Sequence, residues 1–366
     1  MELTTNQLGQ KQVSHAPQLP PRIPSLDGLR AVSILLVVAG HSIDGDRYPR
    51  LFDLVGHLGN LGVRMFFLIS GFLITTLLLK EFDATEQISL RSFYLRRALR
   101  IFPAFYVFVA TVYILGRMGV VTLLPGDMLH ALTYTMNYHL KRAWYLNHIW
   151  SLSVEEQFYL IWPMTLLLAG PSRAVRIAAS AVMVVPLIRT LMYFGPSANP
   201  TAMTRYFQAV ADALASGCLL AFFYNFLGTI KGYIRATAST SFLIVPMILM
   251  VLSGMSYKIS HSLFWILGQT IANIGIFLLL DRCVRFPSDW VGDILNWYPL
   301  RLIGMWSYSI YLWQELFLNP YEPSRMSFRF PINIVCVFAA SIASYYLVEQ
   351  QFLKLKPRGA HNPQQQ

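Results

Sequence analysis

Ten apolar segments, each close to the length that a bilayer requires, are the feature that most restricts the fold of this chain. A stretch of about 20 apolar residues crosses the hydrocarbon core as a helix, because a helix satisfies its own backbone hydrogen bonds there. The sequence therefore predicts an all-α, polytopic membrane protein with about ten transmembrane helices. The segments lie near residues 29–46, 58–80, 101–120, 153–170, 177–194, 209–227, 240–256, 262–281, 302–319 and 331–349.

The composition supports a membrane protein and argues against two other classes. Hydrophobic residues make up 55% of the chain and charged residues 13%, with a mean hydropathy of +0.47, which is unlike a water-soluble catalytic domain. The net charge of +11 could indicate nucleic acid binding, but the basic residues are spread between the apolar segments. We therefore expect the lipid bilayer, and no nucleic acid, as a partner. The three cysteines have no metal-ligand spacing, so we expect neither a disulfide nor a metal site.

The polar ends and the loops predict how the chain is organised. We interpret residues 25–351 as one membrane domain between flexible cytoplasmic tails at 1–24 and 352–366. The first tail lacks the pattern of a cleavable signal peptide, so we expect the first helix to stay as an anchor. Loops on the side of the N-terminus carry about twice as many Lys and Arg as the opposite loops, which predicts that both termini are cytoplasmic.

Arg30 and His41 lie eleven residues apart inside one apolar segment, SLDGLRAVSILLVVAGHS. Eleven steps of about 100° end within about 20° of the starting direction, so both side chains share one helix face about 16 Å apart. Ionisable groups inside a membrane are costly and usually line a bundle interior, so the pair is a candidate functional site. The alternative is an Arg that reaches the headgroups and a His that bonds a neighbouring carbonyl.

A second basic element follows the first cytoplasmic loop. Arg97 and Arg100 are three residues apart and share a helix face, which suits the binding of a phosphate group. Ordinary anchoring of a helix at the cytoplasmic membrane surface is the alternative.

An acidic element, HIWSLSVEEQFYLIWP, enters the fourth apolar segment. Glu155 and Tyr159 share a face, and Ser151 precedes Glu155 by the same interval of four residues. Glu156 fits a solvated acid near a helix N-terminus. Glu155 is therefore the better candidate for a buried partner of His41.

Several stretches together resemble the acyltransferase 3 family of integral membrane O-acyltransferases. These stretches are LDGLRAVSILLVVAGHS, GVRMFFLISGFLI, RRALRIFPAFY, HIWSLSVEEQFYLIWP, ADALASGCLLA, IGMWSYSIYLWQ and a final VEQ. The resemblance implies a ten-helix domain in a bacterial inner membrane. It also implies transfer of an acyl group, by default acetyl, from cytoplasmic acyl-CoA to a hydroxyl of a carbohydrate or lipid-linked saccharide on the outer side. Acyl-CoA would be a co-substrate rather than a permanently bound cofactor, and lipopolysaccharide or exopolysaccharide biosynthesis would be the setting.

The resemblance also implies roles for individual residues. Arg30 and His41 match the essential pair of the first helix, Arg97 and Arg100 match an Arg-x-x-Arg element associated with the donor, and Glu155 matches the acid of the WSLSVE motif. Three further residues in the matching stretches are expected to bind substrate or donor, namely Ser70, Trp150 and Tyr159. The family often has His where this chain has Gln314, which departs from the pattern.

These residues suggest a mechanism in which the CoA phosphates bind the arginines and the thioester approaches His41. His41 would act as a general base or become transiently acylated, and Glu155 would orient its imidazole. Trp144, Tyr145 and Trp150 would stack on sugars, or serve as interfacial aromatics.

A transporter or flippase that uses Arg30, His41 and Glu155 as a relay is the alternative function. The absence of a visible internal repeat disfavours it. Some family members carry a further hydrolase-like domain after the helices, and since this sequence stops soon after the tenth segment, we expect any such partner to be a separate protein.

Overall fold

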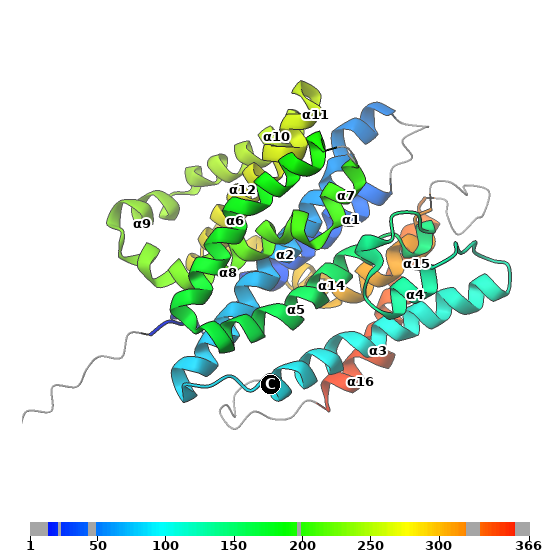
Figure 1. The fold of residues 1–366 in the computed structure, drawn as a ribbon, viewed down its shortest axis with the longest axis horizontal. Coiled ribbons are helices and arrows are strands. Elements are labelled where there is room, and N and C mark those ends of the chain that lie inside the picture. Colours follow the sequence, from blue (N-terminus) through cyan, green and yellow to red (C-terminus); the bar gives the residue numbers. More distant parts are fainter. Residues whose placement is uncertain (1–13, 21–22, 43–48, 196–198, 320–329, 356–366) are drawn as a thin grey trace, which may run out of the picture.

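The computed structural model describes residues 14–20, 23–42, 49–195, 199–319 and 330–355. All regular elements in this part of the chain are helical, and the long helices form one bundle (Figure 1). The long helices are α1 (Ser25–His41), α2 (Pro49–Thr85), α3 (Leu90–Arg117), α5 (Trp150–Ala169), α6 (Pro171–Phe194), α8 (Phe207–Thr229), α10 (Ile244–Ile259), α12 (Gln269–Arg285), α14 (Tyr298–Phe317) and α15 (Ile332–Ser344). Shorter helices are α4 (Asp127–Leu132), α7 (Pro200–Arg205), α9 (Lys231–Ala238), α11 (His261–Leu263), α13 (Trp290–Leu295) and α16 (Gln350–Leu353).

The helices confirm the predicted fold class of an all-α polytopic membrane protein. Each of the ten predicted segments falls on a helix, although residues 43–46 of the first segment lie outside the described residues. By length and hydropathy alone, six helices of the described chain can cross a membrane, or seven if α9 and the helix that follows at a bend of 86° form one span. The 17-residue α1 is shorter than those six, and α5 and α14 carry polar residues of the candidate site. The number of ten spans stays a prediction.

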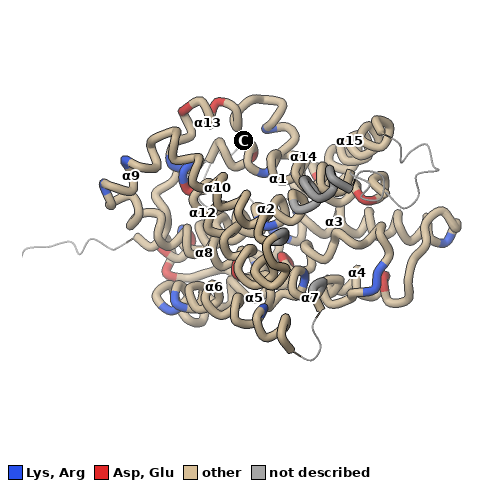
Figure 2. The backbone as a smooth tube through the Cα atoms, turned by 90° about the horizontal axis from the view of Figure 1, so that it is seen from above, with Lys and Arg blue, Asp and Glu red and all other residues tan. Residues whose placement is uncertain are grey.

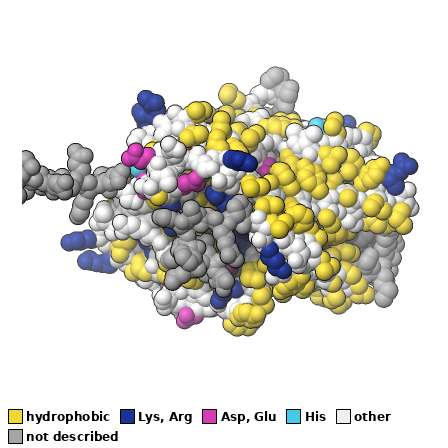
Figure 3. Space-filling view, turned by 90° about the horizontal axis from the view of Figure 1, so that it is seen from below, with side chains coloured by type: hydrophobic (Ala, Val, Ile, Leu, Met, Phe, Trp, Pro, Cys, Tyr) yellow, Lys and Arg dark blue, Asp and Glu magenta, His cyan; other side chains and the backbone are white. Residues whose placement is uncertain are grey.

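The outer surface of the bundle is apolar, as lipid contact requires. Leu168 of α5 and Leu191 of α6 are 75% and 73% exposed, and hydrophobic side chains cover much of the face seen in Figure 3. Charged positions are few along the chain (Figure 2). In water, such an extended apolar surface would promote aggregation, whereas in a bilayer it contacts acyl chains.

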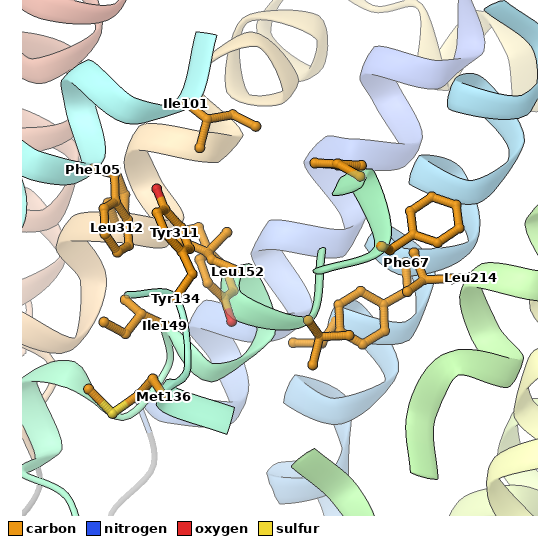
Figure 4. Close-up of a cluster of buried hydrophobic side chains, with 14 of the residues drawn as sticks. Phe67, Ile101, Phe105, Tyr134, Met136, Ile149, Leu152, Leu214, Tyr311 and Leu312 are labelled. Atoms are coloured by element: carbon orange, nitrogen blue, oxygen red, sulfur yellow. The ribbon is translucent and has the colours of Figure 1, made fainter. Parts of the chain in front are cut away.

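The interior of the bundle joins helices that are far apart in sequence. Aromatic and aliphatic side chains from α2, α3, α5, α8 and α14 form the largest buried cluster (Figure 4). Phe105 of α3, for example, stacks on Tyr134 with 4.3 Å between ring centroids. This cluster fixes the helices around the polar cavity described below.

Glycines hold α1 closely against its two neighbours. A Cβ at Gly62 of α2 would lie 2.4 Å from the backbone oxygen of Ser33, and one at Gly304 of α14 would lie 1.9 Å from that of Asp27. Small residues allow membrane helices to approach in this way. The sequence thus places α1, which carries Arg30 and His41, between α2 and α14.

Part of the predicted N-terminal tail is bound to the bundle. The Ala16 amide donates to Asp83 Oδ2 at 2.7 Å, and Asn225 Nδ2 donates to the Ala16 carbonyl at 2.7 Å. Residues in this stretch therefore contact the C-terminal ends of α2 and α8, and the flexible tail at 1–24 stays a prediction.

Candidate active site

A cavity of about 100 Å³ lies between α1, α2, α3, α5 and α14. Its apolar lining includes Phe66, Phe67 and Leu73. Its polar lining consists of Arg30, Ser70, Arg97, Arg100, Ser151, Glu155, Glu156, Tyr159, Ser307, Tyr308 and Tyr311. Most of the site residues predicted from the sequence thus meet in one cavity, while His41 and Trp150 lie outside its lining.

The lining of the cavity includes three guanidinium groups, those of Arg30, Arg97 and Arg100. The Arg97 guanidinium carbon lies 5.1 Å from the Tyr159 ring centroid and 5.8 Å from that of Phe93, at cation–π distances. Arg30 Nη1 lies 3.4 Å from Oδ1 of Asp27. The ion pairs among the described residues include neither Arg97 nor Arg100. These arginines can therefore offer hydrogen-bond donors to an anionic ligand in the cavity.

Glu155 lies in the same cavity and is held by α2. The Ser70 hydroxyl donates to Glu155 Oε1 at 2.6 Å, and the Tyr159 hydroxyl donates to Ser70 Oγ at 3.2 Å. Glu155 bonds Ser70 in the cavity, whereas the carboxylate that the structure shows against His41 belongs to α14, so the expected pairing of Glu155 with His41 stays a prediction. Its acidic neighbour Glu156 also lines the cavity rather than pointing only to solvent.

His41 is held by two consecutive residues of α14. Its Nδ1 lies 3.1 Å from Gln314 Oε1, and its Nε2 lies 3.6 Å from Glu315 Oε1. Gln314 Oε1 can accept a hydrogen bond from Nδ1, and in the tautomer that makes this bond Nε2 is the basic nitrogen. The carboxylate that faces His41 is therefore Glu315.

Glu315 is fully buried and is the centre of a small polar network. Its Oε2 accepts from the His148 amide at 2.9 Å and lies 3.0 Å from His148 Nδ1, and its Oε1 accepts from Asn147 Nδ2 at 3.2 Å. The loop before α5 thus fixes a carboxylate of α14, which in turn faces α1.

Tyr311 connects this network to the cavity. It lines the cavity, and its hydroxyl donates to the His148 carbonyl at 2.9 Å while also bonding Ser151 Oγ. Residues 148 and 151 therefore form the boundary between the arginine-lined cavity and the surroundings of His41.

Aromatic side chains complete the His41 region. The Trp144 ring meets the His41 ring edge to face with 6.0 Å between centroids. Trp150 packs against Phe67 at 6.1 Å in the buried cluster, and its expected role in substrate binding stays a prediction.

Sequence reasoning missed Glu315, His148 and Tyr311. A signal was present for the first, because an acidic residue inside an apolar helix indicates a functional or paired position. Within the described part of the chain, no group of three or more His, Cys, Asp and Glu side chains is arranged to hold a metal ion.

Comparisons with known proteins agree with the predicted family. The profile of the acyltransferase domain of the acyltransferase 3 family matches residues 23–349. The chain is 28% identical to peptidoglycan O-acetyltransferase OatA of Listeria monocytogenes, over 80% of this chain and 48% of the relative. It is 30% identical to YrhL of Bacillus subtilis, provisionally named a peptidoglycan O-acetyltransferase, over 82% of this chain and 49% of the relative. A Staphylococcus aureus protein provisionally named an O-acetyltransferase is also 30% identical, over 91% of this chain and 57% of the relative.

The chain spans about half the length of these curated relatives. No solved structure matches it. The family profile covers most of the chain, from the start of α1 to the end of the π-helical turn that follows α15. The chain belongs to the acyltransferase 3 family of integral membrane proteins.

Proposed function

We propose that this protein transfers an acetyl group from acetyl-CoA to a hydroxyl of a cell-surface carbohydrate, with peptidoglycan as the first acceptor to test. Membership of the acyltransferase 3 family and the names of two relatives support an enzyme over a transporter. The observation that carries the proposal is the cavity in which Arg30, Arg97 and Arg100 meet, on the same bundle that holds His41 against a carboxylate. The earlier expectation of lipopolysaccharide or exopolysaccharide as the setting stays a prediction.

The donor fits this arrangement by charge and by length. The phosphates of CoA would bind the three guanidinium groups, which present planar pairs of donors. Arg30 and His41 are separated by a rise of about 16 Å along α1, so the pantetheine arm would extend beside this helix and bring the thioester to His41. The cavity of about 100 Å³ is smaller than the range of about 300–1,000 Å³ typical of sites for small molecules, and we propose that the helices move apart as the donor binds.

The reaction uses His41 Nε2 as the base. The acceptor hydroxyl oxygen attacks the thioester carbonyl carbon while its proton moves to Nε2, and Glu315 at 3.6 Å stabilises the resulting imidazolium. The carbon–sulfur bond then breaks, and the departing CoA thiolate takes the proton from Nε2. A route in which Nε2 first carries the acetyl group uses the same atoms and needs a second transfer to the hydroxyl.

The location of the donor in the cell suggests how the bundle is oriented in the membrane. We propose that the Arg97 end of the cavity faces the cytoplasm, where acetyl-CoA is made, and that His41 faces the outer side. This orientation agrees with the distribution of Lys and Arg in the loops.

The test uses the purified protein in lipid nanodiscs with acetyl-CoA and soluble peptidoglycan fragments. Mass spectrometry should find acetylated fragments with the wild type and none with His41→Ala, whose thermal stability should stay close to wild type because His41 is partly exposed. Hydrolysis of acetyl-CoA without a modified glycan would point to another acceptor. Stable protein that neither consumes nor binds acetyl-CoA would overturn the proposal.

A further inference from the structure

We propose that His148 is a positioning residue whose imidazolium pairs with Glu315, so that Glu315 is neutralised while it orients His41. The inference deepens the proposed function and rests on it for its kinetic consequences. Its structural basis is the set of contacts around the buried His148 ring.

Both ring nitrogens of His148 face oxygen acceptors. Nδ1 lies 3.0 Å from Glu315 Oε2, and Nε2 lies 3.0 Å from the backbone carbonyl oxygen of Leu312. A carbonyl oxygen only accepts, so Nε2 carries a proton. A proton on Nδ1 as well makes the ring an imidazolium.

The alternative arrangement would place the shared proton on Glu315. This carboxyl group, however, also receives the His148 amide at 2.9 Å and Asn147 Nδ2 at 3.2 Å. Several N–H donors directed at one carboxyl group favour its ionised form. The contacts therefore favour an ion pair between the His148 imidazolium and the Glu315 carboxylate, and both side chains are fully buried.

The ion pair between His148 and Glu315 changes the electrostatic potential at the His41 ring. An unpaired buried carboxylate 3.6 Å from Nε2 would strongly favour the protonated form of His41, which is useless as a base. When Glu315 is already paired with His148, it still orients the His41 ring and stabilises the His41 imidazolium that forms during transfer. Its attraction for a proton on His41 before the reaction is weaker. Two other groups act on Glu315, namely the hydroxyl of Tyr311 and the guanidinium of Arg205 at the end of α7. Trp144 and Gln314 are the uncharged neighbours of His41.

The kinetic test is the pH dependence of acetyl transfer by His148→Gln, which removes the cation and keeps a polar group. With Glu315 no longer neutralised, His41 should stay protonated to higher pH, so the acid limb of the rate profile should move upward by about one pH unit. His148→Lys restores a cation and should return the limb toward wild type. A purely structural role would lower the rate at every pH and leave the limb in place.

His130→Gln is the matched control. His130 lies in α4, bonds Thr135 and stacks on His139, and these contacts lie outside the Glu315 network. Its substitution should leave the acid limb unchanged. An equal shift in this variant would contradict a specific role for His148.

A second measurement needs neither a variant nor turnover. In wild-type protein labelled with ¹⁵N in its histidine rings, an imidazolium signal should persist at about pH 8.5, where ordinary histidines are neutral. Absence of such a signal would overturn the proposal even if His148→Gln fails to fold. This experiment does not depend on acetyl-CoA. A persistent imidazolium signal in a protein without transferase activity would therefore contradict the proposed function and leave the pairing of His148 with Glu315 supported.

Discussion

Two neighbours on α14 contact the ring nitrogens of His41 and orient its imidazole. Gln314 Oε1 lies 3.1 Å from Nδ1, while Glu315 Oε1 faces Nε2 at 3.6 Å. Gln314 supplies an acceptor that does not titrate near neutral pH. One helix thus sets both the orientation of the imidazole and the stability of its cation.

Substitution of Glu315 and substitution of Glu155 should change different kinetic constants. Glu315→Gln should lower kcat by about 100-fold or more with little change in KM for acetyl-CoA, because the amide cannot stabilise the imidazolium. Glu155→Gln should chiefly change KM, because Glu155 bonds Ser70 in the arginine-lined cavity. Steady-state kinetics of both variants, with thermal unfolding as a control for the folded fraction, provide the test. Loss of kcat from Glu155→Gln alone would restore Glu155 as the partner of His41.

The arginines of α3 should control donor affinity. Arg97→Ala and Arg100→Ala should each raise the KM for acetyl-CoA to an extent that corresponds to about 1.5–3 kcal/mol, since each loses a charge-assisted contact with phosphate. Lysine at either position should rescue only part of the loss, because it lacks the planar fork. Arg91→Ala, at an exposed position on the same helix, is the matched control. Unchanged CoA affinity in both cavity variants would limit these arginines to membrane anchoring.

The close contact between α1 and α14 is a further requirement of the site. A methyl group at Gly304 would lie 1.9 Å from the backbone oxygen of Asp27, so Gly304→Ala should push α14 away from α1. We expect a loss of about 1–3 kcal/mol in stability together with a fall in kcat, because the distance between Glu315 and His41 depends on the same pair of helices.

Gly254→Ala on α10 is the control for this prediction, since a methyl group there meets no atom within 4 Å. Thermal unfolding in detergent and the transfer rate are the two measurements. Equal behaviour of the two alanine variants would show that the α1–α14 contact tolerates displacement.

The positions of the long helices could be predicted from the sequence because each contains an apolar segment of spanning or near-spanning length. Each predicted apolar segment coincides with a helix, and the spacing between Arg30 and His41 correctly placed both on α1. The bend of 86° between α9 and the next helix, the docking of residues 14–20 and the depth of Glu155 along α5 could not be predicted. These features depend on contacts between distant segments, about which periodicity gives no information.

In the candidate site, too, local groupings could be predicted from the sequence and contacts between distant segments could not. The residues that share one helix face, such as Arg97 with Arg100 and Glu155 with Tyr159, could be grouped from spacing alone. The pairing of His41 with Glu315 could not, because it joins positions that are 274 residues apart and depends on the packing of α1 against α14.

The molecule combines an apolar exterior and a largely apolar core with a set of buried polar groups that lie along α1. The arginine-lined cavity lies toward one end of this helix, and the His41–Glu315–His148 network lies at the other. Between them, the hydroxyl of Tyr311 contacts the His148 carbonyl. This arrangement is compatible with the proposed reaction, in which the acyl donor binds at the arginines and the acceptor hydroxyl binds at His41 on the opposite side of the membrane.

Acetyl transfer across a sealed membrane tests this account most directly. Vesicles with the protein in one orientation would receive labelled acetyl-CoA on the side of Arg97 and Arg100, with peptidoglycan fragments on the side of His41. We predict that labelled fragments accumulate with the wild type and not with His41→Ala. Transfer that occurs only when donor and acceptor share one side, or that persists in His41→Ala, would contradict the account.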